Sequence, residues 1–349
     1  MRAIVALMTS SSSHRGATRC SMHFLASGSS GNCMLLRTPT ANLLIDFGLP
    51  PETFVGLLRA EGIDIKYWRE HRAGASRKKS TDLPQPDCDS PHRLTAALLT
   101  HTHGDHYMPS ALRILKDNHV QLWAHRGHLP ELGANSAFRK MHDAGHVNHY
   151  DNANFQPVEG IQVTALKLPH DSTATHGFVI EVGIADSQPV RIGYAADMGY
   201  FPVEHSEALA NCDLLALEFN HDVTMERQSN RHPRQIERVL GQWGHLSNEQ
   251  GAEALRLILQ KSHHVKPHCV ALLHLSHDCN RPHLAETAAT QVLREFGLGC
   301  RILITRHREC AGSVDLLART VNRVARNAEL SAAPRRNVTH SIPDFFGHE

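Results

Sequence analysis

The sequence predicts a globular protein of the α/β (α+β) class, and two observations support this prediction. Hydrophobic residues make up 41% of the 349 residues and charged residues 20%, which is enough apolar material to bury a large core. Short apolar runs of strand length alternate with helical patterns along most of the chain. A chain of this length forms one large domain or two ordinary ones.

The predicted strands are apolar runs bounded by turn-forming residues. The run Ser-Gly-Ser-Ser-Gly-Asn at 27–32 predicts a tight loop directly before the first of them. The strands are expected at Cys33–Arg37, Asn42–Asp46, Thr95–Thr100, Val120–Ala124, Ile161–Leu168, Gly177–Val182, Val190–Ala196, Leu214–Glu218, Cys269–Leu275 and Arg301–Thr305.

The clearest helix begins after Ser247. Gln250 follows three residues later, and this pair is typical of a capping box, in which each side chain bonds a free backbone N–H of the first turn. Apolar residues then recur at helical spacing, which predicts one buried face: Ala252, Leu255, Ile258 and Leu259.

The chain is expected to form one main domain over residues 21–318. Residues 1–20 are polar and are expected to form a disordered leader. Residues 66–95 are basic at first and then interrupted by proline, so we interpret them as an inserted surface loop. Residues 319–349 are expected to form a C-terminal helix and a loose tail, and the amphipathic pattern of this helix runs from Val314 to Ala328.

Composition excludes several classes of protein. The chain has 36 Lys and Arg against 35 Asp and Glu, so a globally basic nucleic-acid coat is excluded. No apolar run approaches the roughly 18 residues of a membrane span, and Ala3–Met8 is too short for a signal-peptide core. The 8 cysteines form no C-x-x-C pair, which indicates thiols of a reducing compartment and hence a cytoplasmic location.

Histidine is unusually frequent, with 28 residues, and clustered neutral imidazoles are typical metal ligands. The sharpest cluster, His101-Thr102-His103-Gly104-Asp105-His106, directly follows an apolar strand. Two histidines separated by one residue can converge on one ion from a loop. The following Asp105 and His106 can reach a second ion beside it, where the carboxylate offsets part of the charge. This spacing favours a two-metal site over a histidine-rich surface loop.

Three further ligand-type residues come where a predicted strand ends. His170 follows Ile161–Leu168, Asp197 follows Val190–Ala196, and His274 lies near the end of the strand that begins at Cys269. Functional residues gather where chains leave a sheet, so these three are candidates to complete the metal site. His277, three residues after His274, is the alternative ligand.

From about Met22 to Thr305 the chain resembles the metallo-β-lactamase superfamily. The resemblance lies in the order of its motifs: a strand, the H-x-H-x-D-H motif, then a His, an Asp and a further His. The resemblance implies a four-layer αββα sandwich, in which Asp46 matches the first, structural motif. It also implies two divalent metal ions, zinc with manganese or iron as alternatives. A hydroxide between the ions would be the nucleophile, with its pKa lowered by the metals.

The same resemblance assigns the ligands residue by residue. His101, His103 and His170 would hold one ion, and Asp197 would bridge the two. The second ion would be held by Asp105, His106 and His274, and Asp105 is also predicted to be a catalytic residue.

A narrower resemblance is to the YycJ (WalJ) branch of the superfamily. It rests on four segments, which are Ser27–Asn32, Glu218–Asp222, Gly244–Asn248 and His274–Ser276. The branch implies a DNA exonuclease working 5′ to 3′, with nucleic acid as the substrate. The Gly-His-Leu-Ser segment also resembles the Gly-His-Ser segment of ribonuclease Z, and Glu218 the glutamate that precedes it there.

These resemblances imply further roles. His245 would contact a phosphate or donate a proton to the leaving oxygen, oriented by Glu218; the alternative is a structural histidine before a helix. The loop at 27–32 would present groups to a phosphate or only shape the wall of the site. The predicted substrate-contacting residues are Ser29, Ser30, Asn32, His221 and Asn248, and Asp222 is a further candidate.

Basic residues outside the motif could hold a polyanion, although a charged run is more often a solvated face. They are the insert at 66–95 and Arg227, Arg231, Arg234 and Arg238. Tyr67 and Trp68 within the insert could stack on bases.

The favoured interpretation is a dinuclear metal hydrolase that cleaves phosphodiester bonds in nucleic acid. One alternative keeps the site but changes the substrate to a small phosphodiester, lactone or thioester. An alternative of another class is a nucleic-acid-binding regulatory protein with structural metals. A complete set of ligands around an open site argues against the last.

Overall fold

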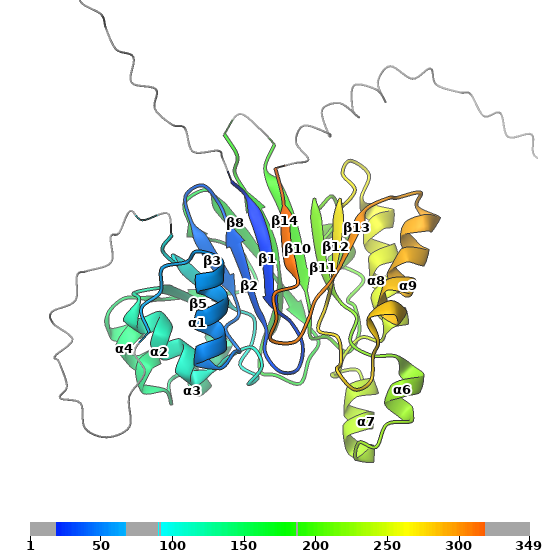
Figure 1. The fold of residues 1–349 in the computed structure, drawn as a ribbon, viewed down its shortest axis with the longest axis horizontal. Helices are drawn as coiled ribbons and strands as arrows, with labels where there is room; N and C mark the ends of the chain where they lie inside the picture. Colours follow the sequence, from blue (N-terminus) through cyan, green and yellow to red (C-terminus); the bar gives the residue numbers. More distant parts are fainter. Residues whose placement is uncertain (1–18, 68–89, 91, 186–187, 318–349) are drawn as a thin grey trace, which may run out of the picture.

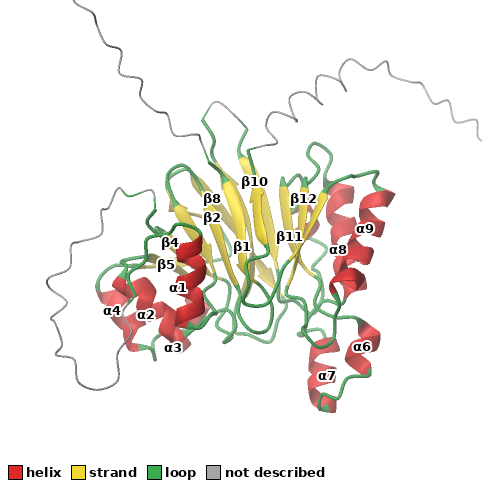
Figure 2. Cartoon of the chain, viewed as in Figure 1, coloured by secondary structure: helices red, strands yellow, loops and turns green. Residues whose placement is uncertain are grey.

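The computed structural model describes residues 19–67, 90, 92–185 and 188–317. Within these residues two seven-stranded sheets face one another, and helices cover their outer faces (Figures 1 and 2). The predicted four-layer αββα sandwich is therefore confirmed. No helix of the described chain is long and apolar enough to cross a membrane.

The first sheet has the strand order β14-β1-β2-β3-β4-β5-β6. Neighbouring strands are parallel from β3 to β6 and antiparallel from β14 to β3. Its strands are β1 (Ser21–Ala26), β2 (Cys33–Arg37), β3 (Asn42–Ile45), β4 (Ala96–Leu99), β5 (Gln121–His125), β6 (Val147–Tyr150) and β14 (Gly312–Asp315).

The second sheet has the order β13-β12-β11-β10-β9-β8-β7. It is parallel from β10 to β13 and antiparallel from β7 to β10. Its strands are β7 (Asn154–Val158), β8 (Ile161–Leu168), β9 (Thr175–Val182), β10 (Val190–Ala195), β11 (Leu214–Glu218), β12 (Cys269–Leu273) and β13 (Arg301–Ile304).

Helices form the two outer layers (Figure 2). The first sheet is covered by α1 (Pro51–Ala60), α2 (Pro109–Asp117), α3 (Leu129–Leu132) and α4 (Ser136–Asp143). The second is covered by α5 (His205–Ala208), α8 (Asn248–Lys261) and α9 (Pro282–Glu295). Two short helices, α6 (Val223–Arg227) and α7 (Pro233–Leu240), project from the sandwich below α8 and α9 (Figure 1).

Both sheets are buried on both faces, which explains why their strands are continuous apolar runs. In β3, Leu43 and Ile45 pack into the core between the sheets, whereas Leu44 packs against the helices. In β11, Leu214 points into the same inner core and Leu215 into the helix-covered core. A central parallel strand that is covered on both faces has no polar face. Its sequence is therefore a continuous apolar run rather than an alternation of apolar and polar residues.

The predicted helix after Ser247 is confirmed as α8, including its capping box. The Ser247 hydroxyl accepts a hydrogen bond from the backbone N–H of Gln250 at 3.2 Å, and Gln250 Oε1 accepts one from the N–H of Ser247 at 2.8 Å. Each predicted strand coincides with an observed one to within a few residues. Four strands were missed because their patterns are short or mixed: β1, β6, β7 and β14.

Two boundary predictions are wrong where the described residues test them. Val314 does not begin a helix, because Gly312–Asp315 form β14 and pair with β1. Cys20 does not belong to a disordered leader, because its side chain is fully buried in the core between the sheets. The rest of the leader at 1–18, the insert at 68–89 with Trp68, and the tail at 318–349 lie outside the described residues and stay predictions.

Candidate metal centre

Most residues of the site lie at the carboxyl ends of parallel strands in the two sheets, whereas His170 follows the antiparallel strand β8. Asp46 follows β3, His101 comes just after β4, Asp197 follows β10 and His274 follows β12. Glu218 is the last residue of β11, which lies between β10 and β12, the strands that precede Asp197 and His274. Because the two sheets face one another, these ends bring side chains from distant parts of the chain to one edge of the sandwich.

Three of these residues have left-handed backbone conformations, with φ of +61° at Asp46, +65° at Asp197 and +57° at His274. Such conformations are uncommon outside glycine and cost about 1–3 kcal/mol each. Surrounding hydrogen bonds hold them in place. The backbone N–H of Asp46 donates to the carbonyl of Leu98 at 2.9 Å, and that of His274 donates to Ser27 Oγ at 2.9 Å. Strain of this kind clusters at functional sites.

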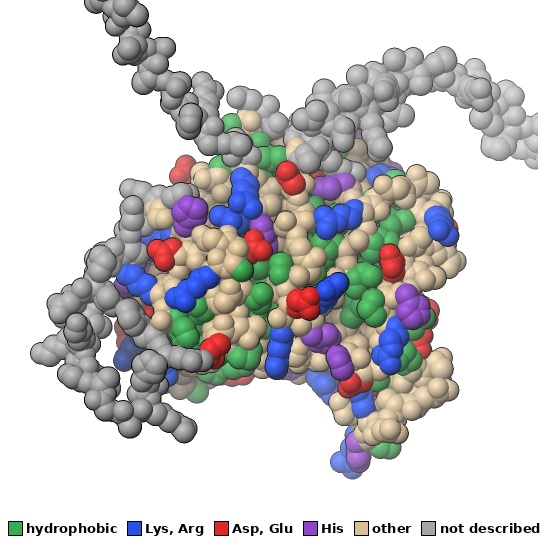
Figure 3. Space-filling view, in the orientation of Figure 1, with side chains coloured by type: hydrophobic (Ala, Val, Ile, Leu, Met, Phe, Trp, Pro, Cys, Tyr) green, Lys and Arg blue, Asp and Glu red, His purple; other side chains and the backbone are tan. Residues whose placement is uncertain are grey.

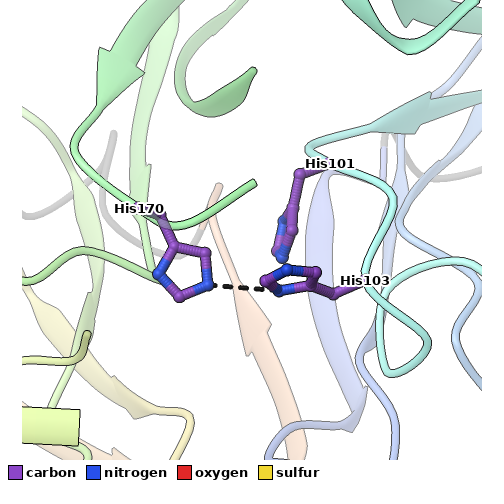
Figure 4. A group of neighbouring side chains, drawn as sticks. All are labelled: His101, His103 and His170. Carbon is purple, nitrogen blue, oxygen red and sulfur yellow. Dashed lines mark hydrogen bonds between the residues drawn. The ribbon is translucent and has the colours of Figure 1, made fainter. Parts of the chain in front are cut away.

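The first ligand group consists of His101, His103 and His170 (Figure 4). His103 Nδ1 lies 3.2 Å from His170 Nε2. The other ring nitrogen of His170, Nδ1, donates to the carbonyl of Gly244 at 2.9 Å, which leaves the Nε2 lone pair facing His103. His101 Nε2 is buried and has no hydrogen-bond partner among the described residues. A buried nitrogen without a partner is costly unless a ligand satisfies it.

The second group consists of Asp105, His106 and His274. Asp105 Oδ2 lies 3.1 Å from His274 Nε2 and 3.7 Å from His106 Nε2. His106 Nδ1–H donates to Asp46 Oδ2 at 2.7 Å, so its Nε2 lone pair faces the group, where it accepts a hydrogen bond from Asn32 Nδ2 at 2.8 Å. A carboxylate on the far nitrogen of a ligating imidazole fixes its ring orientation and raises its basicity, which is the role the structure gives Asp46.

Asp197 lies between the two groups. Its Oδ2 is 3.0 Å from His106 Nε2, and its Oδ1 is 3.4 Å from His274 Nε2. It also forms a ligand group with His101 and His106, so it faces residues from both halves of the site. Its two oxygen atoms are therefore positioned for the bridging role predicted for it.

The residues fit a pair of divalent transition-metal ions. In every ligand group the candidate atoms lie within 4.8 Å of one another. Two nitrogens bound to one tetrahedral zinc ion, with bonds of about 2.0–2.1 Å, are roughly 3.4 Å apart, close to the 3.2 Å between His103 and His170. Imidazole and carboxylate ligands suit zinc, iron and manganese.

The two groups differ in charge. Burial lowers the pKa of His101 well below its ordinary value and also lowers that of His170. Burial alone would do the same to His106, but the carboxylates of Asp197, Asp46 and Asp105 raise its pKa well above the ordinary value.

The pKa of His274 is likewise raised to about 9, because Asp197, Asp105 and Glu218 outweigh its burial. The imidazoles in turn lower the pKa values of Asp105 and Asp197. Negative charge is thus concentrated in the second group, which favours a second cation beside the first.

His245 and Glu218 form a pair beside the ligands. His245 Nδ1–H donates to Glu218 Oε1 at 2.7 Å, and the same nitrogen lies 3.5 Å from Asp197 Oδ1. Glu218 is fully buried, and its other oxygen accepts the backbone N–H of Met198 at 3.0 Å. The ring is therefore fixed through Nδ1, which leaves Nε2 as the atom available to a substrate. The side chain of His245 is 12% exposed.

Sequence reasoning missed four residues that position the candidate ligands. The Thr100 hydroxyl and backbone N–H both donate to Asp46 at 2.8–3.0 Å. Asn220 Nδ2 donates to the carbonyl of His274 at 2.7 Å, and Ser27 Oγ accepts the N–H of His274. Asp171 lies 3.4 Å from His170 Nε2. Thr100 and Asp171 are direct neighbours of ligands in the sequence, a signal that could have revealed them.

Three of the predicted substrate-contacting residues are buried. Asn32 is 1% exposed, and its Oδ1 accepts hydrogen bonds from Ser27 Oγ and the N–H of Gly28. Asn248 exchanges amide hydrogen bonds with Asn280 at 2.9–3.0 Å. His221 is 1% exposed, and its Nδ1 has no partner among the described residues. Their contact with a substrate stays a prediction.

The loop at 27–32 is the predicted tight turn. Gly28 and Gly31 have φ of +136° and +142°, and a Cβ on Gly31 would lie 2.7 Å from the carbonyl oxygen of Gly48. Ser29 is exposed, and Ser30 Oγ lies 3.1 Å from His307 Nδ1. Of the five predicted contacts, Ser29 is therefore the most open to solvent.

Further candidates have partners away from the ligands. Arg231 pairs with the buried Glu226 at 3.0 Å and with Asp278 at 3.3 Å. His277 is 80% exposed and belongs to no ligand group of the described residues. Asp222 caps α6 by accepting the N–H of Met225.

Among the other basic and aromatic candidates, Arg238 reaches the metal centre through Asp171, which lies 3.4 Å from His170 Nε2. Arg227 and Arg234 are exposed. The hydroxyl of Tyr67 donates to Glu52. On the face shown in Figure 3, basic and acidic side chains are interspersed, in accordance with the small net charge.

Two facing sheets with helices outside, and two ligand groups at the strand ends, define a metal-dependent hydrolase of the αββα type. Residues 68–265 match the model of the beta-lactamase superfamily domain, and the chain belongs to that family. The predicted resemblance to the metallo-β-lactamase superfamily is thus confirmed.

Similar proteins agree with this assignment. The chain is 27% identical over 275 residues to "Exodeoxyribonuclease WalJ" of Streptococcus pneumoniae serotype 2 (strain D39 / NCTC 7466), covering 79% of this chain and 88% of that protein. It is 25% identical over 288 residues to "Exodeoxyribonuclease YycJ" of Bacillus anthracis, covering 80% and 91%. These relatives bear out the predicted likeness to the YycJ branch.

Solved structures share the fold. The metallo-beta-lactamase fold protein YhfI from Bacillus subtilis superposes with a TM-score of 0.55 at 14% identity, over 85% of this chain and 99% of that one. Zn(2+)-bound PqqB from Methylobacterium extorquens superposes with a TM-score of 0.54 at 17% identity, over 85% and 100%. At this level of identity the likeness concerns the fold alone.

Proposed function

We propose that the protein is a metal-dependent phosphodiesterase acting on nucleic acid, specifically a DNA exonuclease that works 5′ to 3′. The observation that carries the proposal is a pair of ligand groups facing Asp197, with the His245–Glu218 pair directly beside them. Two relatives of 25–27% identity are named exodeoxyribonucleases, which supports DNA as the substrate. The polarity rests on the resemblance to the YycJ branch.

The proposed cofactors are two divalent ions, zinc before manganese or iron. When bound, such ions lower the pKa of a water and offset the charge of a phosphodiester. The residues that would hold them are His101, His103 and His170 on one side, Asp105, His106 and His274 on the other, and Asp197 between them.

The contribution of the protein begins with fixed ligand orientation. Asp46 accepts from His106 Nδ1–H, and it is itself held by two hydrogen bonds from Thr100. The carbonyl of Gly244 holds His170 in the same way. These bonds keep the lone pairs aimed into the site before any ligand arrives, which removes reorganisation from the reaction.

The protein also supplies a proton donor for the leaving group. The alkoxide that departs from a phosphodiester is a poor leaving group, so a donor adds about 10²–10⁴ in rate. His245 is the candidate, because the hydrogen bond to Glu218 fixes its Nδ1 and holds the ring in one orientation. Donation then occurs from Nε2, the nitrogen that the Glu218 bond leaves available.

Two measurements on the purified full chain test the proposal. Bis-p-nitrophenyl phosphate should be hydrolysed, and a chelator should abolish the reaction. Single- and double-stranded DNA labelled at the 5′ or the 3′ end should lose the 5′ label first, as mononucleotides or short fragments. Hydrolysis of the small ester without any attack on DNA would favour a small-molecule substrate. Binding of DNA with no hydrolysis of either substrate would indicate a binding protein and overturn the proposal.

A further inference from the structure

Large apolar side chains are exposed in one place among the described residues. Tyr200 is 48% exposed, Val203 59% and Trp243 51%. Single exposed apolar residues are ordinary, but these three come from only two short segments. One segment begins three residues after Asp197, and the other ends two residues before His245. Half-exposed aromatic rings next to residues of the metal centre need an explanation other than packing.

The two segments lie directly against each other. A Cβ added to Gly199 would lie 2.2–2.5 Å from the backbone of Gln242 and Trp243, so the contact requires glycine. Tyr200 is the next residue after this contact, and Trp243 takes part in it. The backbone segments that carry the two aromatic residues are therefore adjacent.

Hydrogen bonds connect this pair to the metal centre. The N–H of Asp171 donates to the carbonyl of Trp243 at 3.2 Å, and His170 Nδ1–H donates to that of Gly244 at 2.9 Å. The N–H of Gly199 donates to the carbonyl of Pro169 at 2.9 Å. The aromatic pair is thus built on the same loops that hold His170 and His245.

An arginine that is ion-paired with Asp171 lies near Trp243. Arg238, near the end of α7, bonds the carboxylate of Asp171 through Nε and Nη2, and its side chain is 47% exposed. Arg234 is exposed one turn earlier on the same helix. Aromatic side chains beside cations are the usual means of binding single-stranded nucleic acid without reading its sequence.

We infer that Tyr200 and Trp243 form a platform on which unpaired bases of a single-stranded nucleic acid stack as the strand reaches the metal centre. The inference rests on the proposed function and specifies the form of its substrate. In a duplex the faces of the bases are covered by their neighbours, so only a single strand or a frayed end can use the platform. Removing one stacking ring typically weakens affinity roughly 5- to 150-fold.

The test measures binding as well as activity. A fluorescently labelled, phosphorothioate-linked oligothymidylate resists cleavage, so its anisotropy reports affinity for the protein as purified. Trp243→Ala should weaken this binding roughly 5- to 150-fold, whereas Trp243→Phe should retain most of it. Val203→Ala, a change to an exposed apolar residue of the same region, is the matched control and should have no effect. An oligonucleotide of abasic spacers should bind weakly and equally to all four proteins.

Cleavage of an abasic strand with ordinary phosphodiester bonds separates stacking from structure, because this strand has no aromatic ring. Trp243→Ala should cleave it at the rate of the unmodified protein. Equal loss of cleavage on the abasic strand and on DNA, equal loss of affinity for both, or a Phe variant as weak as the Ala variant would overturn the platform. If Trp243→Ala bound the labelled oligothymidylate with unchanged affinity, the platform would also be overturned, while the proposed function would still stand. Failure of the unmodified protein to bind or cleave any DNA would instead overturn the proposed function.

Discussion

Two groups of histidines lie at the ends of neighbouring parallel strands, and only one of them is built as a metal centre. The metal centre begins just after β4 with His101. The second group, here termed the outer histidine cluster, consists of His125 at the end of β5 with His128 and His176. The ring centroid of His125 lies 4.6 Å from that of His176 and 5.9 Å from that of His128.

The difference between the groups lies in their hydrogen-bond partners. In the metal centre the imidazoles face carboxylates, as His106 does with Asp46 and Asp197. In the outer histidine cluster two imidazoles donate to neutral oxygens. His128 Nε2–H bonds the carbonyl of Ala174 at 2.6 Å, and His176 Nε2–H bonds Asn152 Oδ1 at 2.7 Å. No three ligand atoms of this cluster come within 4.8 Å of one another in the described structure.

The electrostatic consequence differs for the histidines that face several carboxylates. In the metal centre, carboxylates raise the pKa of His274 to about 9, whereas in the outer histidine cluster burial lowers the pKa of His176 to about 3. The pKa values of His125 and His128 are also lowered by burial. Clustered histidine is therefore not itself a metal site. Converging lone pairs and nearby carboxylates make it one, and without them the same residue type serves as a neutral core residue.

The largest expected effect comes from removing a ligand of the metal centre. His103→Ala and Asp105→Ala should each lose activity by several orders of magnitude, since each removes a metal ligand at the reacting centre. Unfolding temperature should change little, because the three apolar cores do not include either residue. Rates on bis-p-nitrophenyl phosphate and metal content by elemental analysis check this. Near-normal rates in either variant would refute the assignment of the site.

The next effect concerns His245, which lies with Asp197, Glu218 and His274 in a further group of ligand-type residues and for which we propose the role of proton donor. His245→Ala should slow cleavage of DNA by about 10²–10⁴, because a poor alkoxide leaving group loses its proton donor. p-Nitrophenolate departs without a proton, so hydrolysis of the p-nitrophenyl ester should fall far less. Metal content should not change. Loss of a metal ion would show that His245 is itself a ligand.

A smaller effect is expected from Glu218→Gln. The amide oxygen can still accept the hydrogen bond of His245 Nδ1, but this bond is no longer charge-assisted. Charge-assisted hydrogen bonds are about twice as strong as neutral ones, so cleavage of DNA should slow by about tenfold. As with His245→Ala, the rate on DNA should fall more than the rate on the p-nitrophenyl ester. Equal losses on both substrates would point to a packing defect around the buried side chain.

The sequence was most informative where one segment carries the signal. The H-x-H-x-D-H motif and the apolar strand before it share one short stretch, so both could be predicted. The contacts that orient ligands join distant segments, such as Ser27 with His274 across 247 residues, and spacing does not reveal these. Outer cluster residues such as His176 were not distinguished from surface histidines, because burial depends on how the sheets pack.

The smallest expected effect tests the outer histidine cluster and concerns stability rather than activity. The pKa of His176 is about 3 in the folded protein and about 6.5 in an unfolded chain. Between these values the unfolded chain binds a proton that the folded protein does not, so stability is complete above pH 6.5 and falls as pH decreases. The loss attributable to this group should reach about 2 kcal/mol at pH 5.

His176→Gln removes this pH dependence and keeps an N–H donor for Asn152. Urea unfolding at pH 7 and pH 5 should therefore show a smaller drop in stability for the variant than for the unmodified protein, by about 2 kcal/mol. His142→Gln, at a side chain that is 59% exposed, is the matched control and should leave the drop unchanged. Activity and metal content at pH 7 should stay the same in both variants. If His176→Gln instead lost metal, the two histidine groups would form one functional site, and the contrast drawn between them would fail.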